Sequence, residues 1–387
     1  MKDENNKFNQ DLEEQAPRAA SIETEDAVES EAAAELEAEE SVMRDVRIVS
    51  PASLVFKRFF RSRLSVIGLI MFIALLLFSF VGPMLSGWGE TEVDRSPGVT
   101  TYTPLMTTFV GADGESYTVV QLVSDTPSVN IHAPMFSYGI KNYGTENEER
   151  VLHVFGTDKD GRDVLVRLMC GGRISLTVSF LTVVLIAVFG IIMGGLAGYF
   201  GKWVDMLIMR IVDIINCVPT LPILLIFSAI LDAYAETYDF LRTYRIYIMM
   251  GFLTLISWTG TARLVRGQIL FLREQEYMVA ADALGMSSAR KIFRHLVINV
   301  MPQLIVSMTL SLGSMILYEA TLGYLQLGVP SPYASWGNMI ELAKDPLVMQ
   351  YYANEWLPSG ICIILAVLAF NFVGDGVRDA LDPKMKR

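Results

Sequence analysis

Cysteine and histidine are rare in this chain of 387 residues, with three of each. Three cysteines cannot build a disulfide framework, and all three lie inside or at the edge of apolar runs, where cysteine packs as a small hydrophobic residue: Cys170, Cys217 and Cys362. The histidines are too scattered to predict a metal site: His132, His153 and His295. We therefore expect neither a disulfide-linked secreted domain nor a bound metal.

The sequence also lacks the short motifs that carry hydrolytic chemistry. It has no HExxH motif, no GxSxG motif, and no pair of carboxylates at a spacing typical of acid–base catalysis. Its Gly-Lys pair, Gly201 and Lys202, is followed by Trp203 and lacks the upstream glycine of a phosphate-binding loop. We expect that the chain is not an enzyme and does not itself hydrolyse ATP.

Basic residues are scarce in the segment 1–50, which holds 15 acidic and 5 basic side chains. The net charge of −11 comes almost wholly from this segment. Nucleic acid is not an expected partner, because phosphate binding needs clustered lysine and arginine. No apolar stretch follows a basic start within the first thirty residues, so the segment does not resemble a cleavable signal peptide. Since it also lacks apolar periodicity, we predict an acidic, disordered cytoplasmic tail.

Apolar residues dominate the chain after residue 50, and the whole chain has 52% hydrophobic residues and a mean hydropathy of +0.39. Six uncharged runs are long enough to cross a hydrocarbon layer of about 30 Å: Leu64 to Leu85, Ile174 to Gly201, Ile214 to Leu231, Ile246 to Ala262, Leu296 to Tyr318, and Trp356 to Gly374. A seventh stretch, 320–340, is broken by glycine and proline and is expected to fold back. We predict an all-α integral membrane protein with six transmembrane helices.

Lysine and arginine near the ends of these runs predict the orientation, since basic residues favour the cytoplasmic side. They precede the first run at 57–63 and flank the segments 202–213 and 263–295 and the C-terminus. Both termini are therefore expected in the cytoplasm of a multi-pass protein of the plasma (inner) membrane. The segment 86–150 then lies outside; it contains the alternating stretch SYTVVQLV, which predicts a small β-rich extracellular insert.

We accordingly expect four parts. They are the tail at 1–50, a basic elbow with the first transmembrane helix at 51–88, the extracellular insert at 89–152, and a five-helix core at 153–387 that includes a cytoplasmic loop at 272–295.

Glycine and proline occur at informative positions in two of the runs. Gly190, Gly194 and Gly198 recur every four residues, which places them on one helix face. This face can serve close helix packing, or a bend or substrate path. Pro219 and Pro222 remove backbone donors and are expected to kink the third run.

Ionisable residues flank the runs without entering them, with Asp205, Arg210 and Asp213 before the third and Glu319 after the fifth. An ion-coupled carrier would need acidic residues or histidines near the middle of the membrane. The pattern therefore argues against a secondary transporter, which remains an alternative together with a channel.

The segment 272–295 combines charge at its ends with small residues in its middle. Glu274 and Glu276 lie toward the start of an expected helix and Arg290, Lys291 and Arg294 toward its end, an arrangement that the helix dipole favours. The small residues give a slim helix that can enter a groove on another protein, or lie at the membrane surface as an ordinary interfacial helix: Ala280, Ala281, Ala283 and Gly285. Gly285 can adopt a positive φ and end the helix.

Ordered motifs resemble the C-type inner-membrane permease subunit of the dipeptide, oligopeptide and nickel ABC importers. Two alanines, three residues and a glycine, followed about ten residues later by an apolar stretch, resemble the EAA loop of these binding-protein-dependent permeases. The remaining motifs are FGTDKDGRDVLVRL (155–168), AGYFGKWVDMLIMRIVD (197–213), ARLVRGQIL (262–270), RHLVINVMP (294–302), SWGNMI (335–340) and AFNFVGDGVRDALDP (369–383).

The resemblance covers about residues 51–85 and 153–387. It departs from the family pattern at Val279, which occupies the position of the EAA glutamate, and at Ile298, where a proline often stands. Pro302 is kept, so the helix break after the loop is expected to be shifted or softer.

The resemblance implies a permease that forms half of a translocation pathway in an ATP-driven importer. Its implied partners are a related B-type permease, two cytoplasmic ABC ATPases that bind ATP and Mg²⁺, and an extracytoplasmic solute-binding protein. Peptides are the implied cargo, with nickel or another small solute as the alternative. The residues implied to couple to the ATPases are Glu276, Tyr277, Ala280, Ala281, Asp282, Gly285 and Arg290. The residues that line the substrate path stay open.

Overall fold

The structure is a computed structural model that describes residues 51–96, 101–110, 115–125, 129–235 and 237–381. The acidic tail at 1–50 and the basic C-terminal end at 382–387 lie outside the described residues. The chain divides into two units, Met1–Phe56 and Lys57–Arg387. The candidate sites lie within the second unit.

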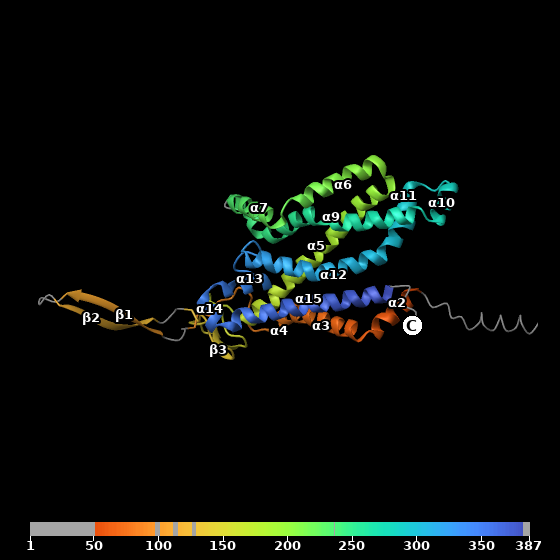
Figure 1. The fold of residues 1–387 in the computed structure, drawn as a ribbon. Helices are drawn as coiled ribbons and strands as arrows, with labels where there is room; N and C mark the ends of the chain where they lie inside the picture. Colours follow the sequence, from red (N-terminus) through yellow and green to blue (C-terminus); the bar gives the residue numbers. More distant parts are fainter. Residues whose placement is uncertain (1–50, 97–100, 111–114, 126–128, 236, 382–387) are drawn as a thin grey trace, which may run out of the picture. The chain divides into compact units, whose positions relative to one another are not determined.

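Long apolar helices make up most of the described chain (Figure 1). Five helical segments are long and apolar enough to cross a membrane: α3 (Arg63–Phe80), α5 (Val164–Phe200), α9 (Arg245–Arg273), the continuous run Ser288–Tyr324 that ends in α12 (Val297–Tyr324), and α15 (Ala353–Leu381). The bent pair α6 (Lys202–Cys217) and α7 (Thr220–Ala235) gives a sixth if it is counted as one span. The prediction of an all-α membrane protein with six spans is confirmed in this form.

Capping residues fix where two of these helices begin. The backbone N–H of Ser65 donates to the Ser62 hydroxyl at the start of α3, and that of Val166 donates to the Asp163 carboxylate at the start of α5. Side-chain oxygens at this position satisfy backbone donors that have no partner within the helix. Helix α2 (Pro51–Arg61) precedes Ser62 and carries Arg58 and Arg61 in its last turn.

The third predicted span is not a continuous helix. Helices α6 and α7 meet at an angle of 81°, and the break falls at Val218 and Pro219. Proline cannot donate a backbone hydrogen bond and its ring restricts the preceding residue to extended conformations. The predicted kink is therefore present, but the run from Ile214 to Leu231 is divided between two helices.

The other helices extend past the uncharged runs in the sequence. Helix α5 begins at Val164 instead of Ile174, and α12 ends at Tyr324 instead of Tyr318. As a result Arg167, Glu319 and Glu355 lie within helices of spanning length, and each is buried. These residues lie in the parts of the helices that extend past the uncharged runs, and contacts within the protein replace water around each charged or polar group.

The segment between α3 and α5 is rich in β-structure, as predicted. Strands β1 (Thr101–Val110) and β2 (Ser116–Asp125) form one antiparallel hairpin, and β3 (Ser137–Lys141) pairs antiparallel with β4 (Glu149–His153). The alternating stretch SYTVVQLV lies in β2. Short helix α4 (Gly82–Leu85) connects α3 to this insert.

Helix α5 is central to the packing. It contacts α9, α12 and α3, while α15 packs along α3 and α12 (Figure 1). The stretch 320–340 does not span: after α12 the chain turns, and α13 (Trp336–Glu341) packs back on α5, α12 and α15. Trp336 is fully buried and its indole N–H donates to the carbonyl oxygen of Leu168 at 3.0 Å.

The connections place features at opposite ends of this bundle. The insert precedes the start of α5, and the short helix α8 (Asp239–Thr243) precedes the start of α9. The turn after α12, with α13, η2 (Leu342–Lys344) and α14 (Pro346–Tyr351), precedes the start of α15. The segment that joins the end of α9 to the start of α12 therefore lies at the other end.

Candidate functional site

The segment that resembles a coupling loop is a short helix between two long ones. Helix α10 (Glu276–Ala283) follows α9, and α11 (Ser288–Arg290) begins the helical run that continues through the π-helix η1 (Lys291–Leu296) into α12. The sequence predicted a single helix with acidic residues at its start and Arg290, Lys291 and Arg294 at its end. That assignment was wrong, because the basic residues belong to the next helical run.

Gly285 ends α10. Its φ is +67°, and the backbone N–H of Met286 donates to the carbonyl oxygen of Ala281 at 3.1 Å. This bond across a residue of positive φ is the Schellman arrangement, which glycine adopts without steric cost. The predicted positive φ at Gly285 is confirmed.

Helix α10 is held to the two long helices by its inner face. Met278 is buried in a cluster with Ile269 of α9 and with Leu296 and Val300. The Asn299 amide donates to the Tyr277 hydroxyl at 3.3 Å and to the His295 carbonyl at 2.8 Å. These contacts join α10 to both α9 and α12.

Three large apolar side chains of the segment 272–295 are strongly exposed. Leu284 is 82% exposed, Phe293 71% and Val279 62%. Of the small residues expected to serve docking, Ala280 is exposed but Ala281 is 4% exposed, so the small size of Ala281 serves packing within this chain. The remaining predicted coupling residues Glu276, Tyr277 and Arg290 are exposed, and Asp282 belongs to α10 but its side chain is outside the described part.

The distortion expected near Pro302 lies upstream of it. Pro302 is inside α12, whereas the irregular turn is the π-helix at Lys291–Leu296. A π-helix has one extra residue per hydrogen-bonded turn and is uncommon, and it often occurs at functional positions. It separates the coupling segment from the regular part of α12.

The glycine face of α5 packs against α9. A Cβ at Gly190 would lie 2.6 Å from the Thr261 Cβ, and one at Gly198 would lie 2.9 Å from the Ile269 Cβ. At Gly194 it would lie 2.9 Å from the Val265 Cβ. The helices approach so closely only because these side chains are missing, which supports the packing interpretation over the substrate-path interpretation.

Helices α5, α9 and α12 also line a cavity of about 300 Å³ in their middle parts. Hydroxyl groups dominate its polar lining: Ser257, Thr261, Ser307, Ser311, Ser314 and Tyr318. Its other lining residues are apolar or glycine, and none is ionisable. Ser311 and Ser314 are exposed on the surface of the chain, and a Cβ at Gly260 would meet nothing within 4 Å. No sequence pattern pointed to this cavity, because it depends on three helices that are far apart in the chain.

A buried ion network organises the turn before α5. Asp158 binds Arg162 Nε at 3.0 Å and Arg167 Nε at 3.2 Å. Both guanidinium groups also donate to the carbonyl oxygen of Pro332, at 3.3 Å from Arg162 and 2.7 Å from Arg167. These contacts join the motif GTDKDGRD to the turn after α12.

His153 joins the insert to the same turn. It is fully buried, with Nδ1 at 2.7 Å from Asp163 and Nε2 at 3.2 Å from Asp94. Burial lowers the pKa of His153, but the hydrogen bonds with the two carboxylates outweigh it, and the pKa is raised above 6.5. The pKa of Asp94 is lowered to about 2, because hydrogen bonds from His153, Ser96 and Asn130 outweigh the effect of burial. Sequence analysis did not predict this pair, because His153 and Asp94 are 59 residues apart in the chain.

One further contact between ionisable side chains and one buried acid lie at the same end. His132 Nδ1 is 2.5 Å from Glu355 Oε1, and this hydrogen bond raises the pKa of His132. Glu319 is 0% exposed, and neither of its carboxylate oxygens has a hydrogen-bond partner among the described residues. The carboxyl group of Glu319 is therefore buried inside the helix bundle.

Comparison with known proteins identifies the family. Residues 178–387 match the family model of the binding-protein-dependent transport system inner membrane component. The chain belongs to this family of transport permeases. Residues 50–103 match a second model, the N-terminal TM domain of oligopeptide transport permease C.

Relatives of the permease carry names from peptide transport. The oligopeptide transport system permease protein OppC of Bacillus subtilis is 40% identical over 66% of this chain and 81% of its own length. The dipeptide transport system permease protein DppC of Alkalihalophilus pseudofirmus is 32% identical over 87% of this chain and 91% of its own length. A putative peptide permease protein of Brucella suis is 40% identical over 60% of this chain and 73% of its own length.

Proposed function

We propose that this permease forms half of a translocation pathway for peptides in an ATP-driven importer. The observation that carries the proposal is the hydroxyl-lined cavity between α5, α9 and α12. Serine and tyrosine hydroxyls can exchange hydrogen bonds with the amide groups of any peptide, whatever its side chains. The exposed Ser311 and Ser314 make this an open face, which a second permease subunit closes.

The proposed partners are a related B-type permease subunit, two cytoplasmic ATPases and an extracytoplasmic solute-binding protein. The relatives named for oligopeptide and dipeptide transport support peptide cargo over nickel. ATP and Mg²⁺ bind to the ATPases, and the proposal assigns no cofactor to this chain.

In the proposed orientation the termini and α10 face the cytoplasm and the insert faces outward. The exposed apolar residues Val279, Leu284 and Phe293 then belong to the surface that docks on an ATPase, since exposed apolar groups can mark a protein contact. ATP-driven movement of α10 passes through Met278 and Tyr277 to α9 and α12, the helices that line the cavity. This is coupling by contact between packed elements.

The test compares two glycines of α9 in the reconstituted complex. Gly260 lines the cavity and Gly251 does not, and an added Cβ meets nothing within 4 Å at either position. Gly260→Leu places a side chain in the path, and we expect it to lower ATP-dependent peptide uptake at least tenfold with assembly unchanged. Gly251→Leu is the matched control and should keep uptake. Equal uptake by both variants would show that the cavity is not on the path.

Two measurements accompany this comparison. Mass spectrometry of the complex purified through a tag on this chain should find two ATPase subunits and a second permease. Uptake should require ATP and should persist when ionophores collapse ion gradients, whereas a secondary transporter would show the reverse. Uptake of nickel instead of peptide would support the alternative cargo.

A further inference from the structure

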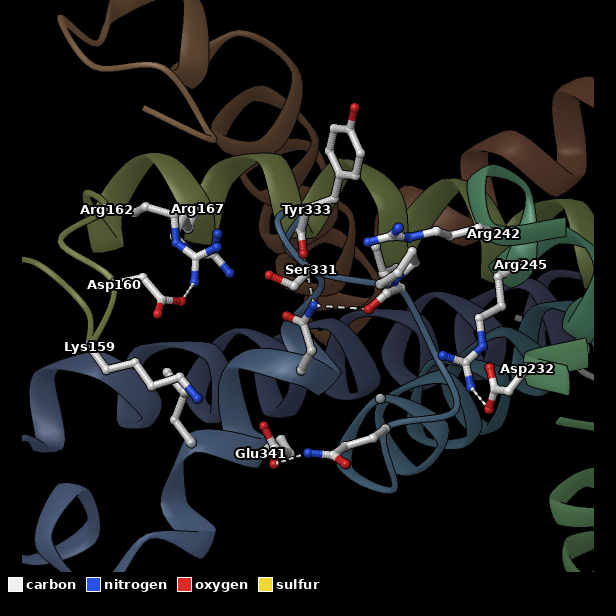
Figure 2. A pocket seen from close by; sticks show the side chains of 16 residues that line it. Lys159, Asp160, Arg162, Arg167, Asp232, Arg242, Arg245, Ser331, Tyr333 and Glu341 are labelled. Carbon is white, nitrogen blue, oxygen red and sulfur yellow. Dashed lines mark hydrogen bonds and ion pairs between the residues drawn. The ribbon is translucent and has the colours of Figure 1, made fainter. Parts of the chain in front are cut away.

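A second cavity, of about 650 Å³, lies at the end of the bundle opposite α10. Figure 2 shows the side chains that line it. It is formed by the turn before α5, the end of α7, α8, the start of α9, and the turn after α12 with α13. Its volume falls within the range of about 300 to 1,000 Å³ that small-molecule sites occupy.

This cavity has an excess of positive charge. Five basic and three acidic side chains line it: Lys159, Arg162, Arg167, Arg242, Arg245, Asp160, Asp232 and Glu341. Three of the basic groups are neutralised by close carboxylates. Arg162 pairs with Asp160 and Asp158, Arg167 with Asp158, and Arg245 with Asp232 at 3.1 Å.

Lys159 and Arg242 account for the excess. Neither forms an ion pair or a side-chain hydrogen bond with a described residue. Both side chains line the cavity and are exposed. Figure 2 shows them on opposite sides of the cavity. The third acid, Glu341, already accepts a hydrogen bond from Gln326 at 2.8 Å and lies 3.8 Å from Lys344. The cavity therefore has two cations available for an anionic ligand.

The basic cavity and the hydroxyl-lined cavity follow one another along the same helices. Arg245 of α9 lines the first, and Ser257 of the same helix lines the second. On α12, Gly323 lines the first and Tyr318 the second. Along the helix axes, Gly323 and Tyr318 are about 7.5 Å apart and Arg245 and Ser257 about 18 Å apart, so the basic cavity lies nearer the end of the bundle and the hydroxyl-lined cavity nearer its middle.

We infer that the basic cavity is a subsite for the C-terminal carboxylate of a peptide at the outer entrance of the path. The inference rests on the proposed function. A carboxylate matches the planar fork of Arg242, and Lys159 on the opposite side of the cavity adds to its positive potential. Only a few of the lining residues are apolar, which disfavours a lipid with its acyl chains. Because the two cations are exposed, binding stays weak enough for a transported group to leave.

The experiment compares one peptide as its free acid and as its C-terminal amide, with vesicles containing the full complex. In the wild type we expect faster uptake of the acid. The double variant Lys159→Gln, Arg242→Gln should reduce uptake of the acid about five- to tenfold and leave uptake of the amide unchanged. The same binding protein is used with every variant. Its own preference for the acid or the amide is therefore the same in all measurements and cancels when the uptake by a variant is divided by the uptake by the wild type.

Two control variants complete the design. Arg150→Gln removes an exposed arginine of the insert that lies over the Tyr138 ring and does not line the cavity, so the acid-to-amide ratio should stay that of the wild type. Lys159→Arg keeps both charges and the planar fork of Arg242 and should keep the preference, even if the neutral variant assembles poorly.

Each of the following four results would contradict the inference, and each would point to a different cause. Equal loss of both peptides, together with lost ATPase stimulation by the unloaded binding protein, would assign the cavity to an acidic surface of that protein. An effect seen in vesicles of anionic lipid and absent in phosphatidylcholine would assign it to a phosphate headgroup. An unchanged acid-to-amide ratio with normal uptake would remove the subsite but leave the proposed function intact. Absence of ATP-dependent peptide uptake in the wild type would contradict the proposed function itself.

Discussion

His153 is a buried base shared by two carboxylates, and it joins the insert to the turn that begins α5. Its Nδ1 and Nε2 atoms reach Asp163 and Asp94, and its ring stacks on Trp88 with the ring centroids 4.4 Å apart. A buried charge is tolerated only where such partners surround it. The attachment of the insert should therefore weaken at high pH, where His153 loses its proton, and at low pH, where Asp94 gains one.

The pH dependence follows from the two shifted pKa values. Because the pKa of His153 is raised in the folded state, its protonated form stabilises the fold below pH 6.5, and this stability is lost as the pH rises through the folded value. The pKa of Asp94 is lowered from 3.8 to about 2, which contributes about 2 kcal/mol above pH 3.8 and loses it as the pH falls toward 2.

We expect the Tm of the purified permease to fall as the pH rises above 6.5, and His153→Gln to reduce this fall. The measurement is thermal unfolding in detergent over that range. His132, whose pKa is also raised by Glu355, contributes in the same direction, so His132→Gln is measured in parallel. His295→Gln in the coupling segment is the control. A Tm that rises with pH in the wild type would contradict the assignment.

Glu319 differs from these residues, because it is a fully buried acid whose carboxylate oxygens have no hydrogen-bond partner among the described residues. Ser175 and Ser335 are close to it. Replacement by glutamine keeps the shape and the capacity for hydrogen bonds while removing any need to bury a charge.

We predict that Glu319→Gln leaves thermal stability unchanged or raises it by about 1 kcal/mol. Glu319→Lys, which must bury an uncompensated cation, should cost about 3 kcal/mol or more. Thermal unfolding and the yield of assembled complex measure both. Loss of uptake in a stable Glu319→Gln variant would instead show that the carboxyl group takes part in transport.

Among the helices, α5 and α9 approach each other closely at the glycines of α5. Gly194 and Gly195 are neighbours in α5 but face different surroundings. A Cβ at Gly194 would lie 2.9 Å from Val265 Cβ and within contact of the Ala262 backbone, whereas one at Gly195 would lie 3.8 Å from the nearest atom, Ile269 Cδ1.

The two glycines give a matched pair of alanine substitutions. Gly194→Ala must push α9 away, and we expect a loss of about 1 to 3 kcal/mol. Gly195→Ala replaces a helical glycine with a better helix former and causes no clash, so it should raise the free energy of unfolding by up to about 1 kcal/mol. Thermal unfolding of the two variants in the same detergent tests this. Similar effects of both would mean that the helices are not in close contact.

Helix α10 is the element on which the proposed coupling depends. Leu284→Asp removes exposed apolar surface without disturbing internal packing, since the side chain is 82% exposed. Gly285→Arg adds bulk and strains a residue with φ of +67°. We expect both to lower ATPase attachment or to uncouple hydrolysis from uptake, with the B-type subunit still bound.

ATPase activity, uptake and subunit stoichiometry in vesicles measure this effect, and Ser287→Ala is the control. Ala281→Glu is a poorer probe, because Ala281 is buried within the chain and a charge there is expected to disturb the fold. Normal coupled uptake by Leu284→Asp and Gly285→Arg would reject α10 as the docking element.

For the complete permease, the orientation in the membrane links the proposals to one another. The subsite for a carboxylate requires the insert end to face outward, and the coupling helix requires the α10 end to face the cytoplasm. Glu146 of the insert and Ser288 of α11 are exposed and lie at these two ends.

Single cysteines at these two positions test the orientation, in a background that lacks Cys170, Cys217 and Cys362. An impermeant maleimide added to intact cells should label Glu146→Cys and should label Ser288→Cys only after the membrane is permeabilised. Labelling of position 288 but not 146 in intact cells would invert the orientation. It would also invert the roles of the two ends.

Local features of the sequence were sufficient to predict the membrane class, the positions of the long apolar helices, the β-rich insert and the glycine that ends α10. These predictions depend on hydropathy, alternation and backbone preference, which are properties of short segments. The family also followed from local motifs.

The remaining features depended on tertiary packing. The third span is split, α5 and α12 extend past the uncharged runs, and the basic residues of the coupling segment belong to the next helix. Packing also brings Asp94 to His153 and places Lys159 and Arg242 around one cavity. Such contacts join residues far apart in the chain, and a hydrogen bond or ion pair between them forms only when the packing of several helices brings the groups within reach.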